Sequence, residues 1–307
     1  MFMSCLQEMP ESENIQLCLQ DFFIEGNTEV HSEQLQRLLK QNKSNIKSLY
    51  INIKDTSSSL GEIIDLFSLT DLSHIQKLYY YGDEEKEAQI SRILFPSLHY
   101  VTLLWGTWTN DEENLNENMA RCQNLQYFNI GSFTLSHKIL ETIFNFISGQ
   151  KSMKELALEW LDCKGHGGHD CKRWNLNLSQ HSTLSKLHLW QLPGRLQLNI
   201  STPPLVDVML MDINLDESSL LLSRDMLNIK RVVLSEIEMS AESLKNFIIV
   251  LEKLPQTVTV TMRYIRPYTE YDRVREYIRR SQTFHMIQEG RRRQQLFEFR
   301  TIKPSKE

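Results

Sequence analysis

The sequence predicts an α/β solenoid, a stack of short repeats whose strands form one parallel sheet. The pattern apolar-x-x-apolar-x-apolar occurs three times in succession, beginning at Leu184, Leu205 and Ile229. Counted from its first residue, the pattern describes a strand that buries positions 4 and 6 and turns positions 3, 5 and 7 outward. Helical patterns occupy many of the gaps between such strands. Self-similarity at a period of roughly 20 to 50 residues is typical of stacked repeats.

The strand pattern extends over most of the chain. Its other first positions are Asn14, Ile46, Ile75, Leu98, Leu125, Met153 and Thr257. The mean period from residue 14 to residue 257 is 27 residues. We therefore expect about nine or ten irregular repeats over residues 1–265, followed by a capping helix and a basic tail over residues 266–307.

Several segments between the strands follow the helical period. The expected helices are residues 29–41, 60–72, 84–94, 111–122, 136–149, 240–254 and, after the last strand, 268–288. Ser136 and Ser240 stand where an N-cap is expected, and Pro255 follows the last residue of its helix. Residues 163–182 and 193–204 instead carry Gly, Pro or alternating apolar residues, which predicts extended connections.

A strand followed by a helix about every 27 residues resembles a leucine-rich-repeat array. The period and the helices resemble the ribonuclease-inhibitor-like horseshoe with a parallel concave sheet, found at the C-terminus of NACHT-type (NLR) innate immune receptors. The resemblance covers roughly residues 14–265. The family's usual Asn at position 9 is replaced here by the apolar residues Phe133, Leu161, Leu192, Ile213 and Ile237. In the family that Asn bonds backbone between repeats, so its absence leaves the subclass open. Some NLR arrays and F-box adaptors are similarly irregular, so the departure excludes neither.

The outward positions of the strands form the expected concave face, where large side chains gather in two places. The candidate partner-binding residues are Tyr50, Tyr79, Tyr81, Tyr100, Tyr127, Trp190 and Met211. Tyr and Trp often anchor protein interfaces, although Tyr also favours strands for its own sake. On the interface interpretation, alanine at Tyr79 and Tyr100 weakens binding and leaves the melting curve nearly unchanged.

We expect no bound metal, and one loop is kept as a candidate ligand set. It consists of Cys163, His166, His169 and Cys171. Four soft or borderline ligands in nine residues are the types that bind zinc. Their spacing is not that of a zinc finger, and the alternative is a surface loop rich in His and Cys.

Motifs and composition exclude several classes of function. No G-x-S-x-G, H-E-x-x-H or Gly-rich phosphate loop occurs, so we expect neither an enzyme nor a cofactor. The chain has no long apolar run and no signal-peptide pattern, and its five scattered cysteines suit a reducing compartment. We therefore expect a cytoplasmic protein with no membrane contact.

The charge is unevenly distributed along the chain. From Arg263 onward twelve Lys or Arg face six Asp or Glu, a net of +6, which leaves −11 of the total of −5 for the first 262 residues. An acidic body disfavours nucleic acid on the concave face. The run Arg291–Arg293 is either a solvated end or a phosphate contact.

The function expected from the sequence is non-catalytic protein recognition, with a protein partner on the concave face. The NLR resemblance implies a ligand-sensing or autoinhibitory array of an innate immune receptor. The alternative is the substrate-recognition array of an F-box-type ubiquitin ligase adaptor.

Overall fold

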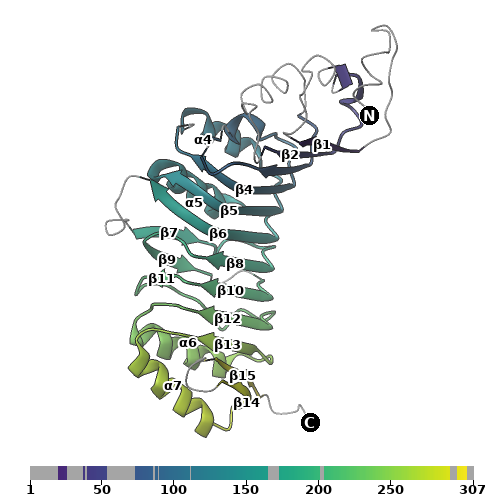
Figure 1. Cartoon of the computed structure of the whole chain (residues 1–307). Coiled ribbons are helices and arrows are strands. Elements are labelled where there is room, and N and C mark those ends of the chain that lie inside the picture. Colours follow the sequence, from purple (N-terminus) through teal and green to yellow (C-terminus); the bar gives the residue numbers. More distant parts are fainter. Residues whose placement is uncertain are drawn as a thin grey trace. The chain divides into compact units, whose positions relative to one another are not determined.

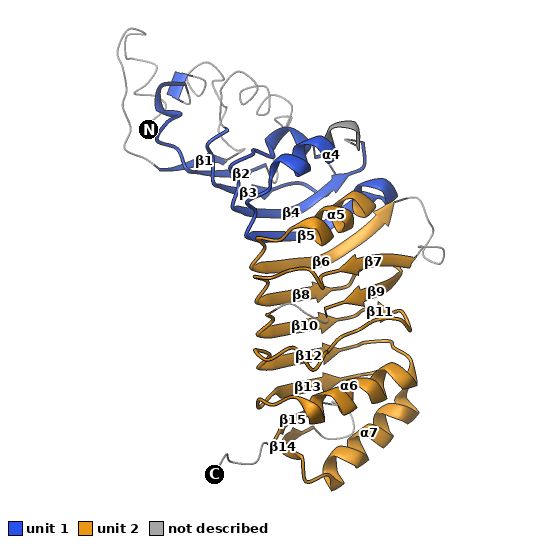
Figure 2. Ribbon diagram, turned by 180° about the vertical axis from the view of Figure 1, so that it is seen from behind, with its two compact units in different colours: residues 1–139 blue, residues 140–307 orange. Residues whose placement is uncertain are grey.

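The computed structural model describes residues 20–25, 37–38, 40–53, 73–85, 87–88, 90–110, 112–164, 173–200, 204–290 and 296–302. The chain divides into two compact units, residues 1–139 and residues 140–307 (Figure 2). Within each unit, short parallel strands alternate with helices or extended segments (Figure 1). The fold is a leucine-rich-repeat solenoid, which confirms the predicted fold class.

The described part of unit 1 contains five parallel strands in chain order, each paired with the next. They are β1 (Asp21–Glu25), β2 (Ser48–Asn52), β3 (Lys77–Tyr81), β4 (Tyr100–Trp108) and β5 (Tyr127–Ser136). The strands pair without a register shift. Position 3 of each strand lies opposite position 3 of the next, as Lys77 lies opposite Tyr100. Positions 4 and 6 are buried in every strand, as Leu49 and Ile51 show. The strands predicted from Ile46, Ile75, Leu98 and Leu125 are therefore confirmed.

The strand that pairs with β2 begins later than the sequence pattern predicts. The pattern at Asn14 would bury Leu17 and Leu19, which lie outside the described residues, whereas β1 begins at Asp21 and buries Phe22 and Ile24. Two apolar alternations overlap here, and the aromatic and β-branched residues of the second favour a strand more strongly. The distance from Asp21 to its partner Ser48 is 27 residues, equal to the mean period of the pattern.

The helical connections of unit 1 agree with the sequence in part. Helix α4 (Glu112–Arg121) is confirmed, but the predicted helix over residues 84–94 is wrong except for the 3-10 turn η1 (Ile90–Ile93). The carboxylate of Glu87 accepts hydrogen bonds from the backbone N–H groups of Thr109 and Asn110, at 2.5 and 2.8 Å. These bonds hold the segment extended beside β4. The predicted helix over 60–72 and most of that over 29–41 lie outside the described residues.

Unit 2 contains a long parallel sheet and a short one. The long sheet consists of β6 (Glu155–Lys164), β8 (Lys186–Trp190), β10 (Asp207–Met211), β12 (Arg231–Ser235) and β13 (Thr259–Arg263). The short sheet consists of β7 (Arg173–Asn177), β9 (Arg195–Asn199) and β11 (Asn214–Leu215). Strands β7 and β9 confirm the two extended connections that the sequence predicts. The core lies between the inner residues of both sheets, for example Leu189 and Leu198.

Two predicted helices are confirmed at the positions of their caps. Helix α5 (His137–Gly149) begins after Ser136, whose Oγ accepts a hydrogen bond from the Ile139 N–H at 3.2 Å. Helix α6 (Ala241–Lys253) begins after Ser240, whose Oγ accepts from the Ser243 N–H at 3.0 Å. Such caps satisfy backbone donors that the helix itself leaves unpaired.

The C-terminal segment is a helix followed by a hairpin. Helix α7 (Tyr268–Arg280) is shorter than the predicted helix over 268–288, because residues from Phe284 onward form β14 (Phe284–Glu289). Strand β15 (Phe297–Thr301) pairs antiparallel with both β14 and β13, so the hairpin covers the last edge of the parallel sheet. The unpaired N–H and C=O groups of an exposed edge strand can pair with another chain and lead to aggregation, and the hairpin prevents this at β13. The domain boundary between residues 265 and 266 stays a prediction.

A left-handed residue follows the outward row of most strands. The residues with positive φ at position 8 are Trp105, Ser132, Trp160, Gln191, Asp212, Glu236 and Tyr264, with φ between 48° and 61°. The backbone N–H groups of Gln191, Asp212 and Glu236 still pair with the next strand, as that of Gln191 does with the Met211 carbonyl at 2.9 Å. At position 9 the chain turns inward and buries the apolar residues that replace the family's Asn, including Phe133 and Ile237. None of the helices in the described ranges is long and apolar enough to cross a bilayer.

Candidate functional site

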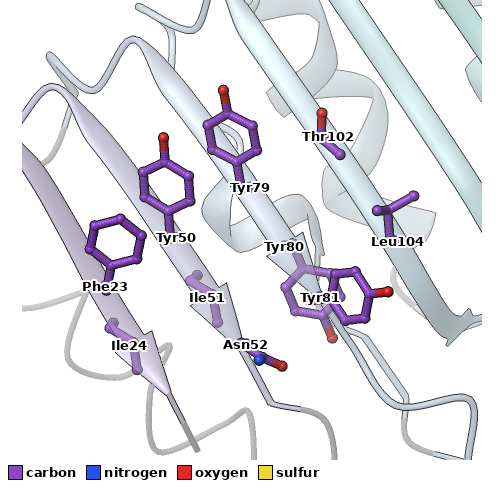
Figure 3. Close-up of a pocket in the computed structure, with 10 residues that line it drawn as sticks. All are labelled: Phe23, Ile24, Tyr50, Ile51, Asn52, Tyr79, Tyr80, Tyr81, Thr102 and Leu104. Carbon is purple, nitrogen blue, oxygen red and sulfur yellow. The ribbon is translucent and has the colours of Figure 1, made fainter.

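Five aromatic residues form a continuous stack on the outward sheet face of unit 1. Phe23, Tyr50 and Tyr79 occupy position 5 of three adjacent strands, so their side chains lie side by side (Figure 3). The centroids of Phe23 and Tyr50 are 4.3 Å apart with an interplanar angle of 12°. Those of Tyr50 and Tyr79 are also 4.3 Å apart, with an angle of 4°.

The stack continues diagonally into the neighbouring outward row. Tyr100 and Tyr127 occupy position 3 of β4 and β5. The Tyr79 and Tyr100 rings are tilted, with centroids 5.0 Å apart, and those of Tyr100 and Tyr127 are 5.4 Å apart. We call Phe23, Tyr50, Tyr79, Tyr100 and Tyr127 the aromatic ladder. The structure thus brings together four of the predicted partner-binding residues, while whether they bind a partner stays a prediction.

Phe23 is the ladder residue that sequence reasoning misses. Its side chain is 63% exposed, more than any other large apolar side chain among the described residues. The sequence pattern places the first strand before Phe23 and so gives Phe23 no outward position. The alternation of Phe22, Phe23 and Ile24 is the feature of the sequence that indicates this position. Phe23 exposes one ring face at the end of the ladder, because only Tyr50 stacks against it among the described residues.

A groove of about 350 Å³ runs beside the ladder across the first four strands. Phe23, Tyr50 and Tyr79 line one side, and Tyr81 and Leu104, at position 7 of their strands, line the other (Figure 3). The indole Nε1–H of Trp105 donates a hydrogen bond to the Tyr81 hydroxyl at 2.9 Å. Tyr81 therefore lies in the wall of the groove and outside the ladder.

The Tyr79 hydroxyl stays protonated at physiological pH. Burial, together with the neighbouring phenols of Tyr100 and Tyr50, raises the pKa of Tyr79 far above its usual range. A neutral phenol both donates and accepts hydrogen bonds. Thr102 lies opposite Tyr79 in the same row; its side chain is buried, and its Oγ1 has no hydrogen-bond partner among the described residues.

A second apolar surface lies on the outward sheet face of unit 2. Trp190 and Met211 lie opposite each other in β8 and β10, which brings these two predicted residues together. The ring of Trp160 lies 4.5 Å from that of Trp190 and is 44% exposed. Sequence reasoning misses Trp160 because it stands at position 8, where a strand pattern alone assigns no direction to the side chain.

Charged residues on the amino-terminal side of this surface pair with one another across strands. The Lys186 Nζ lies 2.7 Å from a Glu155 carboxylate oxygen, and the Arg231 guanidinium lies 3.4 Å from that of Asp207. The remaining contact, His188 Nδ1 to Glu159 at 3.0 Å, becomes an ion pair only when the imidazole is protonated.

The candidate metal ligands are largely outside the described residues. His166, His169 and Cys171 fall there, so the loop is untested as a site. Cys163 is described, and its side chain is buried. Among the described residues no three His, Cys, Asp or Glu side chains are grouped as a metal site requires.

Two buried groups of a kind used in catalysis have structural roles here. Burial raises the pKa of the Cys122 thiol to about 12, which keeps it protonated and a poor nucleophile. The His181 Nε2 lies 2.9 Å from the Ile147 carbonyl at the end of α5, and burial lowers the pKa of its imidazole. His181 therefore links the β7 segment to the helix as a neutral donor.

No protein-family model and no curated protein matches this chain. Among solved structures, it is similar to a leucine-rich-repeat protein of Leptospira interrogans, with 16% sequence identity and a TM-score of 0.35. That similarity covers 72% of this chain and 67% of the other.

Proposed function

We propose that this chain is a non-catalytic module that recognises a protein partner through the outward sheet face of unit 1. The aromatic ladder is the observation that carries the proposal. Its rings and the adjoining groove form an apolar surface on a parallel sheet whose register does not shift. Rigid aromatic side chains at the centre of a surface are the usual anchors of protein interfaces.

The stacking prepares the ladder for binding. Each inner ring is held between two others, so little further rotamer freedom is lost when a partner covers it. Tyrosine side chains offer apolar contact through their rings and hydrogen bonds through their hydroxyl groups. This combination favours a protein surface of mixed polarity.

The same stacking disfavours ligands that need an open ring face. Bases and sugars bind aromatic residues mainly by lying flat on the ring. In the ladder the faces of Tyr50 and Tyr79 cover each other at 4.3 Å, whereas Phe23 keeps an outer face exposed. We therefore infer a protein partner in preference to a nucleic acid or a glycan.

Two cellular settings are proposed from the repeat resemblance, both cytoplasmic. In the first, the array senses a ligand or restrains other domains in an NLR-type innate immune receptor. In the second, it selects substrates for an F-box-type ubiquitin ligase. A NACHT segment or an F-box encoded in the same transcript would distinguish the two settings.

The test is capture of a partner with matched variants of the full chain. Phe23→Ala removes the exposed end of the ladder, and a Tyr79→Ala/Tyr100→Ala double variant removes its middle. Leu227→Ala is the control, because Leu227 is a similarly exposed apolar side chain, at 60%, and belongs to unit 2. Folding of each variant is checked by circular dichroism and by its melting curve.

We expect wild type and Leu227→Ala to retain the same protein and both ladder variants to lose it. Loss of a central aromatic anchor costs on the order of 2 kcal/mol, a decrease in affinity of about thirtyfold. Retention of the partner by both folded ladder variants would refute the proposal.

A further inference from the structure

The outward face of unit 2 combines an apolar centre with an unbalanced charged border. We call the side chains of Trp160, Trp190, Met209, Met211 and Val233 the tryptophan face. Met209 lies opposite Val233 in β12, and Met211 lies opposite Trp190 in β8, so these residues are contiguous. Strands β8, β10 and β12 are neighbours in the sheet (Figure 1). All five side chains are at least partly accessible.

The two borders of this face differ in their charge balance. On the amino-terminal side, Lys186 pairs with Glu155 and Arg231 with Asp207, so that border is neutralised within the chain. A partner gains little by placing charge there, because each charge already has its counterion.

The carboxyl-terminal border carries excess negative charge. Asp212 and Glu236 stand at position 8 of adjacent repeats, and their left-handed backbone, with φ of 49° and 58°, is followed by residues that turn inward. Both side chains are exposed, as is that of Glu238. In the described part of unit 2, neither Asp212 nor Glu236 forms an ion pair within 4.0 Å.

These carboxylates line a pocket of about 300 Å³ at the edge of the sheet. Tyr264, Arg266 and Tyr268 complete its wall. Arg266 supplies a single positive charge against three carboxylates, and its guanidinium is hydrogen-bonded to Tyr268. The Arg263 guanidinium is directed over the Tyr264 ring, 4.9 Å from its centroid. The pocket therefore keeps a net negative charge directly after the apolar face.

We propose that the tryptophan face binds a peptide segment in which a Lys or Arg side chain follows an apolar one. The apolar side chain packs on Trp160 and Trp190, and the cationic side chain enters the pocket between Asp212 and Glu236. Charge complementarity selects this partner, because an acidic segment would meet the same carboxylates as like charges. The inference rests on the proposed function, protein recognition, but places it on a second surface.

The test uses three fluorescein-labelled, end-blocked octapeptides made of Gly and Ser with two Leu and two variable residues. The variable residues are Arg in the first peptide, Gln in the second and Glu in the third. Each is titrated against the full chain by fluorescence anisotropy at low salt and at physiological salt. We expect binding in the order Arg, Gln, Glu, with the preference for Arg weakened by salt.

Variants separate the apolar contribution from the charged one. Trp160→Ala is expected to weaken all three peptides, by about thirtyfold for the Arg peptide. The double variant Asp212→Asn/Glu236→Gln is expected to weaken only the Arg peptide, by about tenfold, because each exposed ion pair contributes about two- to fivefold. Glu217→Gln, which removes an exposed carboxylate on the helix α6 side, is the control and leaves affinity unchanged.

The outcomes also distinguish this inference from the proposed function. Equal binding of the Arg and Glu peptides, or an unchanged affinity of the Arg peptide for the Asp212→Asn/Glu236→Gln variant, overturns the inference. Phe23→Ala alters the ladder alone and should leave the Arg peptide unaffected. Loss of peptide binding in Phe23→Ala would show that the peptide occupies the ladder, and this too would overturn the inference.

Discussion

Replacing Tyr79 by alanine should destabilise unit 1, because its ring is stacked on both sides. Its centroid lies 4.3 Å from that of Tyr50 and 5.0 Å from that of Tyr100. An aromatic pair contributes about 0.5–1.5 kcal/mol beyond burial, so the loss of two pairs should cost about 1–3 kcal/mol. For a folding unit of this size the melting temperature should fall by roughly 2 to 12 °C.

A double-mutant cycle isolates the stacking from the other effects of truncation. Tyr50→Ala, Tyr79→Ala and the double variant are compared with wild type by urea unfolding, and the coupling energy should be about 0.5–1.5 kcal/mol. Lys77→Ala is the control, because Lys77 lies on the same strand and face with an exposed side chain, and its effect should stay within about 0.5 kcal/mol. A coupling energy of zero, or an equal loss in Lys77→Ala, would refute the stacking argument.

Three further predictions concern the backbone and the C-terminal cap. Gly82→Ala should destabilise by about 2 kcal/mol or more in urea unfolding, since its Cβ would lie 2.2 Å from the Trp105 carbonyl oxygen; an unchanged midpoint would contradict this. Gln191→Gly should raise and Gln191→Val should lower the melting temperature, each by the equivalent of about 1 kcal/mol, because φ is 48°; shifts of the same sign would contradict it. The hydrogen bond from Arg279 lowers the pKa of Glu289 below its unfolded value, so its contribution to stability is present above that value and is lost as pH falls through the folded pKa. Glu289→Gln should therefore melt earlier than wild type at neutral pH, and the gap between the two should narrow as pH falls below the ordinary range of a glutamate; a gap that does not change with pH would contradict this.

The strands were predictable because their signal is periodic. Each repeat must bury positions 4 and 6 to contribute to the core. Apolar residues such as Leu187 and Leu189 therefore recur at these positions from strand to strand. The apolar residues at position 9 follow the same rule, because Ile213 and Ile237 are buried where the chain turns inward. The rows formed by positions 3, 5 and 7 are in register within each unit, as the sequence predicts, although Ser48, Thr102 and Ser235 in these rows are buried.

The errors occur where a local pattern has two solutions. Two apolar alternations overlap near β1, and the sequence pattern follows the one that excludes Phe22. Phe23 is therefore missing from the predicted site. A helical period continued past Arg280, but the long-range pairing of Phe297 with Met262 in β13 favours a hairpin for the last segment. Local propensity cannot anticipate such pairing.

The geometry of the candidate site depended on information that a strand pattern lacks. The rows place Tyr50 next to Tyr79, but the parallel stacking also requires the side-chain rotamers. That stacking changes one expectation, since alanine at Tyr79 and Tyr100 is now predicted to lower stability as well as binding. Trp160 is missing from the prediction because its own backbone is left-handed, and that conformation sets the direction of its side chain.

The recurring left-handed residue makes the edge of the sheet open to variation. In unit 2, position 8 is occupied by Trp160, Gln191, Asp212, Glu236 and Tyr264, which are aromatic, amide and acidic residues on nearly the same backbone. The core of each repeat is built from positions such as 4, 6 and 9, so exchange at position 8 need not disturb packing. Mutation at this position alters the charge and shape of the edge one repeat at a time. A library randomised there would sample new binding specificities on an unchanged scaffold.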